Sequence, residues 1–231
     1  MSSTGLIARE ALSDLQRDEM FALLSAHFEG VTRLQFQRDL AGKNWVIEIR
    51  RDGRLLGFST LLVCEREFDG EPITAIFSGD TIVSPEAWNS PALARSWIAA
   101  VNSLRASAQG RRCFWLLLTS GFRTYRFLPV FWREFYPRFD ADTPRALQRL
   151  IDTLASSQYG AQYGVDGIVR FHSPQRLRAA LAEAPDGRAS NAHIAFFLAR
   201  NSGHANGDEL VCITEIAESN LTAAGRRMIS R

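Results

Sequence analysis

The strongest structural signal in the sequence is a series of β-strands joined by two-residue turns. Residues 44–51 (NWVIEIRR) alternate apolar and polar side chains, which is typical of a strand. Asp52 and Gly53 follow directly, and an Asp-Gly pair strongly favours a hairpin turn. Residues 55–65 supply the partner strand, and after a second Asp-Gly turn residues 73–83 form a third. The sequence therefore predicts a meander of three antiparallel strands, around which the rest of the chain must be arranged.

Helical patterns lie on both sides of this meander. Residues 13–28 carry apolar side chains at helical intervals, and Ser13 and Gln16 have the spacing of a capping box. Residues 32–40 predict a second, shorter helix. A Ser-Pro pair at 90–91 favours the start of another helix, because Ser is a good N-cap and Pro is tolerated in the first turn.

The second half of the chain has a less regular pattern. Residues 113–118 (CFWLLL) predict a strand buried on both faces, and the aromatic segment 122–136 predicts a helix that kinks or starts at Pro129. The other expected elements are helices beginning at Pro144 and Pro174, a short strand at 167–171, two strands at 193–199 and 209–216 joined by a turn, and a polar tail from Glu218 whose end is frayed. Segment 137–190 has little apolar core of its own, so we interpret it as a helical insertion in a single domain comprising residues 1–231.

Composition restricts the classes of function. The 231 residues carry a net charge of +2 and are 46% hydrophobic, which is ordinary for a globular protein and does not indicate nucleic-acid binding. The longest apolar run, CFWLLL, is too short to span a membrane, and the N-terminus lacks a signal-peptide pattern. We therefore expect a cytoplasmic protein. Three cysteines without a CxxC pair and four scattered histidines predict neither a disulfide framework nor a metal site.

The order of these predicted elements resembles the GNAT N-acetyltransferase superfamily. The stretch NWVIEIRRDGRLLGFSTLLV is similar to that family's hairpin, including the position of Gly57. The stretch SGDTIVSPEAW is similar to its fourth strand, with Val83 and Pro85 in a Val-x-Pro pattern. The resemblance covers about residues 10–135 and the last two strands. It implies a mixed α/β fold with a mostly antiparallel central sheet flanked by helices.

The resemblance also implies an acyl-CoA site between the fourth and fifth strands of that fold. In the family these strands diverge, backbone groups of the fourth strand pair with the pantetheine arm, and the following loop and helix N-terminus hold the pyrophosphate. The matching residues for a site holding acetyl-CoA or a longer acyl-CoA are Ile82, Val83, Trp88, Asn89, Ser90, Ala92, Thr119, Ser120 and Arg123.

Two departures from the family pattern affect this site. The loop at 84–93 contains no glycine, although glycine lets a backbone approach phosphate closely, and Pro91 lacks an N–H donor. After the fifth strand the family often has an Asn and later a Tyr that protonates the leaving thiolate. Here Thr119 and Ser120 follow that strand, and Tyr125 is a nearby candidate for the acid. The alternative role for Tyr125 is packing within an aromatic helix.

Asp80 is the strongest candidate for chemistry, because it lies in an otherwise apolar strand. A carboxylate there needs a partner or a wet cleft. Strand alternation would place Asp80 on one face with Ile76, Ser78 and Ile82. We interpret it as a general base or as the group that binds a substrate amine, with a structural hydrogen bond as the alternative.

Arg123 is a candidate clamp for phosphate or carboxylate. In one continuous helix it would share a face with Arg126 and Arg133. A solvated helix face is the alternative interpretation.

Three functions remain open at this point. The first is an acyltransferase that moves an acyl group from acyl-CoA, or from a carrier-protein thioester, to an amine of a small molecule or peptide. The second is a GNAT-fold binding protein that does not use acetyl-CoA, and the third is an unrelated enzyme using the same cleft. Insertion 137–190 is a candidate lid over an acceptor site. The sequence leaves the oligomeric state open, a homodimer included.

Overall fold

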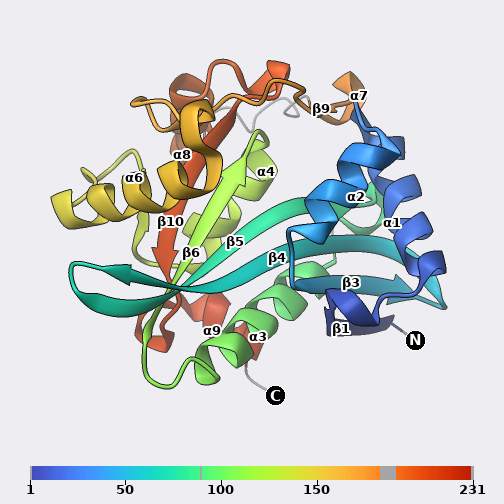
Figure 1. Ribbon diagram of the computed structural model, residues 1–231, viewed down its shortest axis with the longest axis horizontal. Coiled ribbons are helices and arrows are strands. Elements are labelled where there is room, and N and C mark those ends of the chain that lie inside the picture. Colours follow the sequence, from blue (N-terminus) through green and yellow to red (C-terminus); the bar gives the residue numbers. More distant parts are fainter. Residues whose placement is uncertain (1, 89, 183–190, 230–231) are drawn as a thin grey trace.

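A twisted central sheet organises the molecule, whose computed structural model describes residues 2–88, 90–182 and 191–229 (Figure 1). Its strands are β1 (Ser2–Ala8), β3 (Trp45–Arg51), β4 (Arg54–Phe68), β5 (Glu71–Val83), β6 (Arg112–Thr119), β7 (Phe135–Tyr136), β8 (Ile168–Val169) and β10 (Glu209–Glu215). The order across the sheet is β1-β3-β4-β5-β6-β10-β7, and β8 also pairs with β10. Every pair is antiparallel except β5 with β6. A separate two-stranded sheet joins β2 (Phe28–Glu29) to β9 (Arg176–Leu177).

The predicted meander is confirmed in strands β3, β4 and β5. Asp52 and Gly53 have φ angles of 50° and 82°, as a tight hairpin turn between twisted strands requires. The second turn repeats this geometry, with φ angles of 52° at Asp69 and 81° at Gly70. Gly57 is needed where β4 meets the end of β5, because a Cβ atom there would lie 2.7 Å from the carbonyl oxygen of Ile82.

Helices cover both faces of this sheet. They are α1 (Asp14–His27), α2 (Arg33–Ala41), α3 (Ala92–Ala106), α4 (Phe122–Tyr125), α5 (Phe127–Phe131), α6 (Arg145–Tyr159), α7 (Ala179–Ala182), α8 (Ala192–Arg200) and α9 (Ala223–Ile229). Helices α3, α5 and α9 pack on one face, whereas α1, α2 and α6 pack on the other (Figure 1). Within the described part of the chain, no helix is long and apolar enough to cross a membrane.

Strand β6 is buried on both faces, as its continuous apolar sequence predicts. Phe114 and Leu116 pack into the cluster under α6, whereas Trp115 and Leu117 pack into the cluster under α3. This alternation places the strand in the middle of the molecule. Anything that opens beside its C-terminal end is therefore enclosed by core.

The predicted helix starts are largely confirmed. Ser13 Oγ accepts a hydrogen bond from Gln16 N, and the Gln16 side chain accepts one from Ser13 N, which completes the capping box of α1. Helix α3 begins at Ala92, whose N–H donates to Ser90 Oγ at 3.2 Å. The segment after Pro174 is wrong as a helix prediction, because β9 precedes the short helix α7 there.

The strand predicted at 193–199 is wrong, because this segment forms helix α8. Asn191 caps the helix, and its side chain accepts hydrogen bonds from the backbone N–H groups of His193 and Ile194. Ile194 and Phe197 are three residues apart and are both buried. The apolar run therefore has a helical face, and the expected hairpin with β10 does not form.

The continuous helix predicted at 122–136 is also wrong. It breaks into α4 and α5, and the chain becomes extended at β7. Arg133 therefore does not share a helical face with Arg123 and Arg126.

Both ends of the chain carry elements that the sequence did not predict. Residues 2–8 form strand β1, which pairs antiparallel with β3. The C-terminal tail forms α9 against α3 and α5, and residues 230–231, at the end expected to be frayed, lie outside the described residues. Gly225 permits this contact, because a Cβ atom there would lie 2.5 Å from the carbonyl oxygen of Phe131.

Candidate functional site

The candidate site lies where the only parallel pair of the described sheet separates. Strands β5 and β6 pair from Ile73 opposite Arg112 to Ser78 opposite Leu117, and both strands continue beyond that point. Trp115 Nε1 donates to Ser78 Oγ at 2.9 Å, just before the separation. A slot therefore opens between the two strands, with its walls fixed by buried core.

A β-bulge determines the direction of Asp80. Ser59 lies opposite Thr81 and Leu61 opposite Ser78, so two residues of β5 face the single residue Thr60. The extra residue breaks the alternation along the strand. Ile76 consequently packs in the cluster under α3, whereas Ile82 packs in the cluster with α1 and α2. The prediction that Asp80 shares one face with both isoleucines and Ser78 is therefore wrong.

Gly79 lets a lysine cross this bulge. A Cβ atom at Gly79 would lie 2.7 Å from Lys43 Cε and 2.8 Å from Thr60 Oγ1. Lys43 follows α2, and its side chain reaches the bulge and lines the same cavity as Asp80. The result is a half-buried lysine beside the carboxyl of Asp80.

Asp80 has the electrostatics of a proton acceptor. Its Oδ2 atom is buried and has no hydrogen-bond partner among the residues that the structure describes. Burial raises the pKa of Asp80 to about 6, the nearby Asp39 carboxylate adds to the rise, and the Lys43 ammonium opposes it. A carboxyl group with this pKa is mostly ionised near neutral pH and can accept a proton there.

Glu209 is a second, half-buried acid at the site, which the sequence analysis did not identify. It is the first residue of β10, and burial together with the charge of Asp80 raises its pKa to about 7. Glu209 also raises the pKa of Tyr159, after the larger effect of burial. The only available signal was a glutamate at the start of a buried strand after a Gly-Asp pair, and that pattern occurs in many strands without function.

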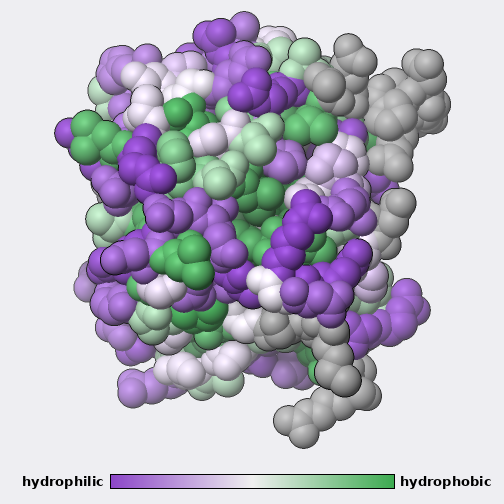
Figure 2. Space-filling view, turned by 90° about the vertical axis from the view of Figure 1, so that its right-hand side faces the viewer, coloured by the Kyte–Doolittle hydropathy of each residue, from purple (hydrophilic) through white to green (hydrophobic). Residues whose placement is uncertain are grey.

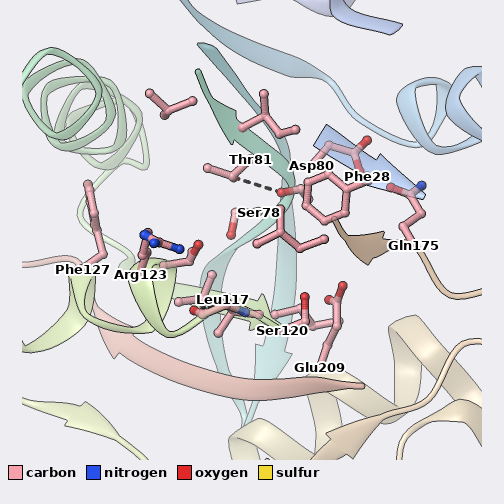
Figure 3. A pocket seen from close by; sticks show the side chains of 18 of the residues that line it. Phe28, Ser78, Asp80, Thr81, Leu117, Ser120, Arg123, Phe127, Gln175 and Glu209 are labelled. Atoms are coloured by element: carbon pink, nitrogen blue, oxygen red, sulfur yellow. Dashed lines mark hydrogen bonds between the residues drawn. The ribbon is translucent and has the colours of Figure 1, made fainter. Parts of the chain in front are cut away.

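One cavity of about 1000 Å³ includes both acids and the slot. Asp80 and Glu209 lie on opposite walls, with Phe28 and Gln175 beside the space between them (Figure 3). Residues of segment 137–190 also line the cavity: Gln158, Tyr159, Gln162, Phe171, Ser173, Gln175, Leu177 and Leu181. On the face in Figure 2, hydrophobic side chains gather near the centre between hydrophilic borders.

The same cavity contains most of the residues predicted to hold acyl-CoA. Ile82, Val83, Trp88, Ser90, Thr119, Ser120 and Arg123 line it. The Ile82 carbonyl faces Gly57 of β4, so it points away from the slot. The Val83 carbonyl accepts a hydrogen bond from Trp88 Nε1 at 2.8 Å. Ala92 lies outside this lining, and Asn89 lies outside the described residues.

Arg123 and Trp88 lie against one another in this cavity. The guanidinium carbon of Arg123 is 4.3 Å from the centre of the Trp88 ring, and its Nη1 donates to the Leu181 carbonyl at 2.6 Å. These contacts link the loop after β5, the helix after β6 and segment 137–190.

The loop after β5 uses several of its own backbone donors. The N–H groups of Ala87, Trp88 and Ser90 donate to carbonyls within the loop, where residues 85–87 form a 3-10 turn. A loop that binds phosphate through its backbone needs such donors free. These three donors are therefore not free to contact a phosphate.

A parallel pair that diverges within an otherwise antiparallel sheet is the arrangement implied by the sequence resemblance. The fold is GNAT-like. Helices flank both faces of the sheet, as in that superfamily, and the slot lies between the strands that correspond to its fourth and fifth.

Comparisons with known proteins found similar solved structures only. No protein-family model and no curated protein matches the sequence. A probable N-acyltransferase from Enterococcus faecalis is 17% identical, with a TM-score of 0.43 over 55% of this chain and 31% of that one. An Escherichia coli GNAT family N-acetyltransferase in complex with CoA is 17% identical, with a TM-score of 0.39 over 55% and 68%. An aminoglycoside acetyltransferase from an uncultured soil sample, in complex with sisomicin, is 13% identical, with a TM-score of 0.40 over 74% and 94%. This chain thus spans under a third of the Enterococcus protein's length.

Tyr125 lies away from this GNAT-like slot. Its side chain is buried in the core, and its hydroxyl donates to the Pro137 carbonyl at 3.0 Å. Burial raises the pKa of Tyr125 above the usual range. Because it does not line the cavity, we assign it no part in the chemistry proposed below.

Proposed function

We propose that this protein transfers an acyl group from a thioester donor to an amine, with Asp80 as the general base. The observation that carries the proposal is the buried, unpartnered Asp80 oxygen in a cavity that continues into the slot between β5 and β6. The donor would be acyl-CoA or the pantetheine thioester of a carrier protein. The acceptor would be an amine of a small molecule or peptide.

The chemistry requires one proton to leave the acceptor. The amine nitrogen forms a bond to the thioester carbonyl carbon, and the carbon–sulfur bond breaks. Asp80 accepts the proton that the nitrogen loses and releases it to water, and the departing thiolate takes one proton up from water, so an amide and a free thiol result. Holding the nitrogen and the carboxylate together in a cavity closed by core supplies proximity as well as proton transfer.

The slot fits a pantetheine arm better than its loop fits a pyrophosphate. Apolar walls from Ala94, Trp97 and Phe127 suit an extended chain, and the Val83 carbonyl is a polar group at that edge. Because the loop uses its own N–H donors, phosphate contacts would depend on the side chains of Arg123 and Arg126, which line the cavity. We therefore place a carrier-protein thioester beside acyl-CoA as a donor.

The same loop supports the second candidate function, a GNAT-fold protein that binds a partner and does not use acetyl-CoA. Calorimetry with acetyl-CoA, longer acyl-CoAs and an acyl-pantetheine distinguishes the two, combined with release of free thiol in the presence of primary amines. Binding together with amine-dependent thiol release is the result that we expect. If none of these donors binds and no thiol is released, the acyltransferase proposal fails and the binding function is favoured.

Replacing Trp88 by phenylalanine is expected to tighten donor binding by about two- to tenfold. The change removes the indole N–H from the Val83 carbonyl, and a typical hydrogen bond contributes about 0.5–1.5 kcal/mol net. In the variant, a bound pantetheine amide would compete for the Val83 carbonyl with water only, and no longer with the indole of Trp88, a residue that is 40% exposed. The dissociation constant of acyl-pantetheine measured by calorimetry tests this. Weaker binding would instead mean that the indole itself holds the donor.

A further inference from the structure

The second acid of the cavity has no role in the transfer described above. Glu209 lies across the cavity from Asp80, on a different strand, and both side chains point into the same space (Figure 3). Within the described part of the chain, no ion pair involves either carboxyl group. One base suffices to deprotonate an amine, so the second acid requires its own explanation.

The charges that act on the two acids do not balance. Asp39, Asp80 and Glu209 interact electrostatically with one another, and Lys43 is the cation that lowers the pKa of both cavity acids, whereas Arg38, Arg123 and Arg126 line the cavity without shifting either pKa. When ionised, the three acids and Lys43 carry a net charge of −2. Buried charges without counter-charges are unfavourable, and a ligand with two positive charges would neutralise this group.

The buried oxygen of Asp80 points independently to a ligand at this position. Oδ2 is shielded from water and receives no hydrogen bond from the described residues. Nearly all buried polar atoms in native proteins are paired, so an unpaired carboxylate oxygen at a cavity wall indicates a donor that arrives with a substrate. An ammonium group is such a donor.

Other walls of the cavity carry amide and aromatic groups. Gln158, Gln162 and Gln175 come from the insertion, together with Tyr159 and Phe171. Amide groups can hydrogen-bond to an uncharged polar body, and aromatic rings can cover its carbons. The fixed negative charges therefore lie at two separate points, as two separate cationic groups of one ligand would require.

We propose that the acceptor carries two amino groups, one facing Asp80 for acylation and the other held as an ammonium by Glu209. This rests on the acyl transfer proposed above and deepens it by naming the class of acceptor. Glu209 acts here as a specificity-determining residue, because it contacts the part of the acceptor that does not react. Amines with a single positive charge would leave its carboxylate unpaired.

Matched probes test the acceptor class by binding, independently of turnover. A short alkyl diamine is compared with the amino alcohol of the same chain length, in which hydroxyl replaces the second ammonium. Calorimetry on the wild-type protein is expected to show the diamine binding about ten- to a hundredfold more tightly, the range for one charge-assisted hydrogen bond. Glu209→Gln should reduce this preference to less than about threefold while leaving the affinity for the amino alcohol nearly unchanged.

Two further variants keep the result interpretable. Glu71→Gln removes an exposed carboxylate at the opposite end of β5 and should retain the full preference. Glu209→Asp keeps the charge but shortens the side chain, so an intermediate preference is expected even if the glutamine variant folds poorly. Equal binding of the two probes to the wild type, no binding of either, or an equal loss of both in Glu209→Gln would overturn the proposal. A diamine preference without thiol release would instead refute the acyl transfer and leave the dicationic ligand.

Discussion

Replacing Asp80 by asparagine is expected to lower the turnover number of acyl transfer by about 10²–10⁴-fold, the usual contribution of a positioned general base. Asparagine has nearly the same shape and can still contact an amine, but it cannot accept a proton at neutral pH. The acceptor KM should therefore change far less than the turnover number. Steady-state kinetics with a fixed donor and a varied diamine measure both quantities.

The pH profile identifies Asp80 more specifically than the loss of rate does. Because burial raises its pKa to about 6, the base is ionised above that pH and protonated below it. The wild-type kcat/KM should fall as the pH drops through about 6. Protonation of the acceptor amine adds its own pH dependence, which the wild type and the variant share. The residual activity of Asp80→Asn should lack this step, and an unchanged turnover number in the variant would remove Asp80 from the mechanism.

Stability measurements separate this loss of activity from unfolding. The folded protein holds the Asp80 proton more tightly than the unfolded chain does, because its pKa is raised. At low pH Asp80 is protonated in both states and does not affect the free energy of unfolding. As the pH rises from 3.8 to about 6, the unfolded chain ionises before the folded protein does, so this group lowers the free energy of unfolding. Asp80→Asn should consequently be at least as stable as the wild type at neutral pH, as thermal unfolding can show.

The predictable part of the fold is the part determined by local chemistry. Asp-Gly turns need positive φ, a strand buried on both faces needs a continuous apolar run, and Ser13 with Gln16 closes its own helix cap. Segment 193–199 was misread because an apolar run of that length suits either a strand or a helix. The decisive signal was the cap at Asn191, which lies just before it.

The candidate site was less predictable because it depends on contacts between distant segments. Strand β5 contains a bulge, so regular alternation along the sequence wrongly placed Asp80 on one face with both Ile76 and Ile82. Glu209 and Lys43 reach the same space from residues far apart in the chain, and neither lies in a motif. A single sequence shows which residues of a strand are polar, but it does not show which carboxyl group from a distant segment will lie opposite them.

Replacing Trp115 by alanine is expected to destabilise the protein by about 3–5 kcal/mol, the typical cost of deleting a buried large aromatic side chain. Its ring centre lies 4.0 Å from that of Trp97 and 5.2 Å from that of Trp132, inside the cluster under α3. For a chain of this size the midpoint of thermal unfolding should fall by roughly 6–20 °C. Guanidinium unfolding followed by far-UV circular dichroism measures the free energy directly.

Trp115→Phe separates the effect of packing from that of the hydrogen bond between Trp115 and Ser78, at the point where β5 and β6 separate. Phenylalanine keeps a ring in the cluster but leaves Ser78 Oγ without its donor, so a loss of about 1–2 kcal/mol is expected. Because Ser78 is the last residue of β5 that pairs with β6, both variants should also weaken donor binding beyond the separation point. If the alanine variant is no less stable than the phenylalanine variant, the aromatic cluster does not hold the two strands at their divergence, and the walls of the slot must be fixed by the remaining backbone pairing alone.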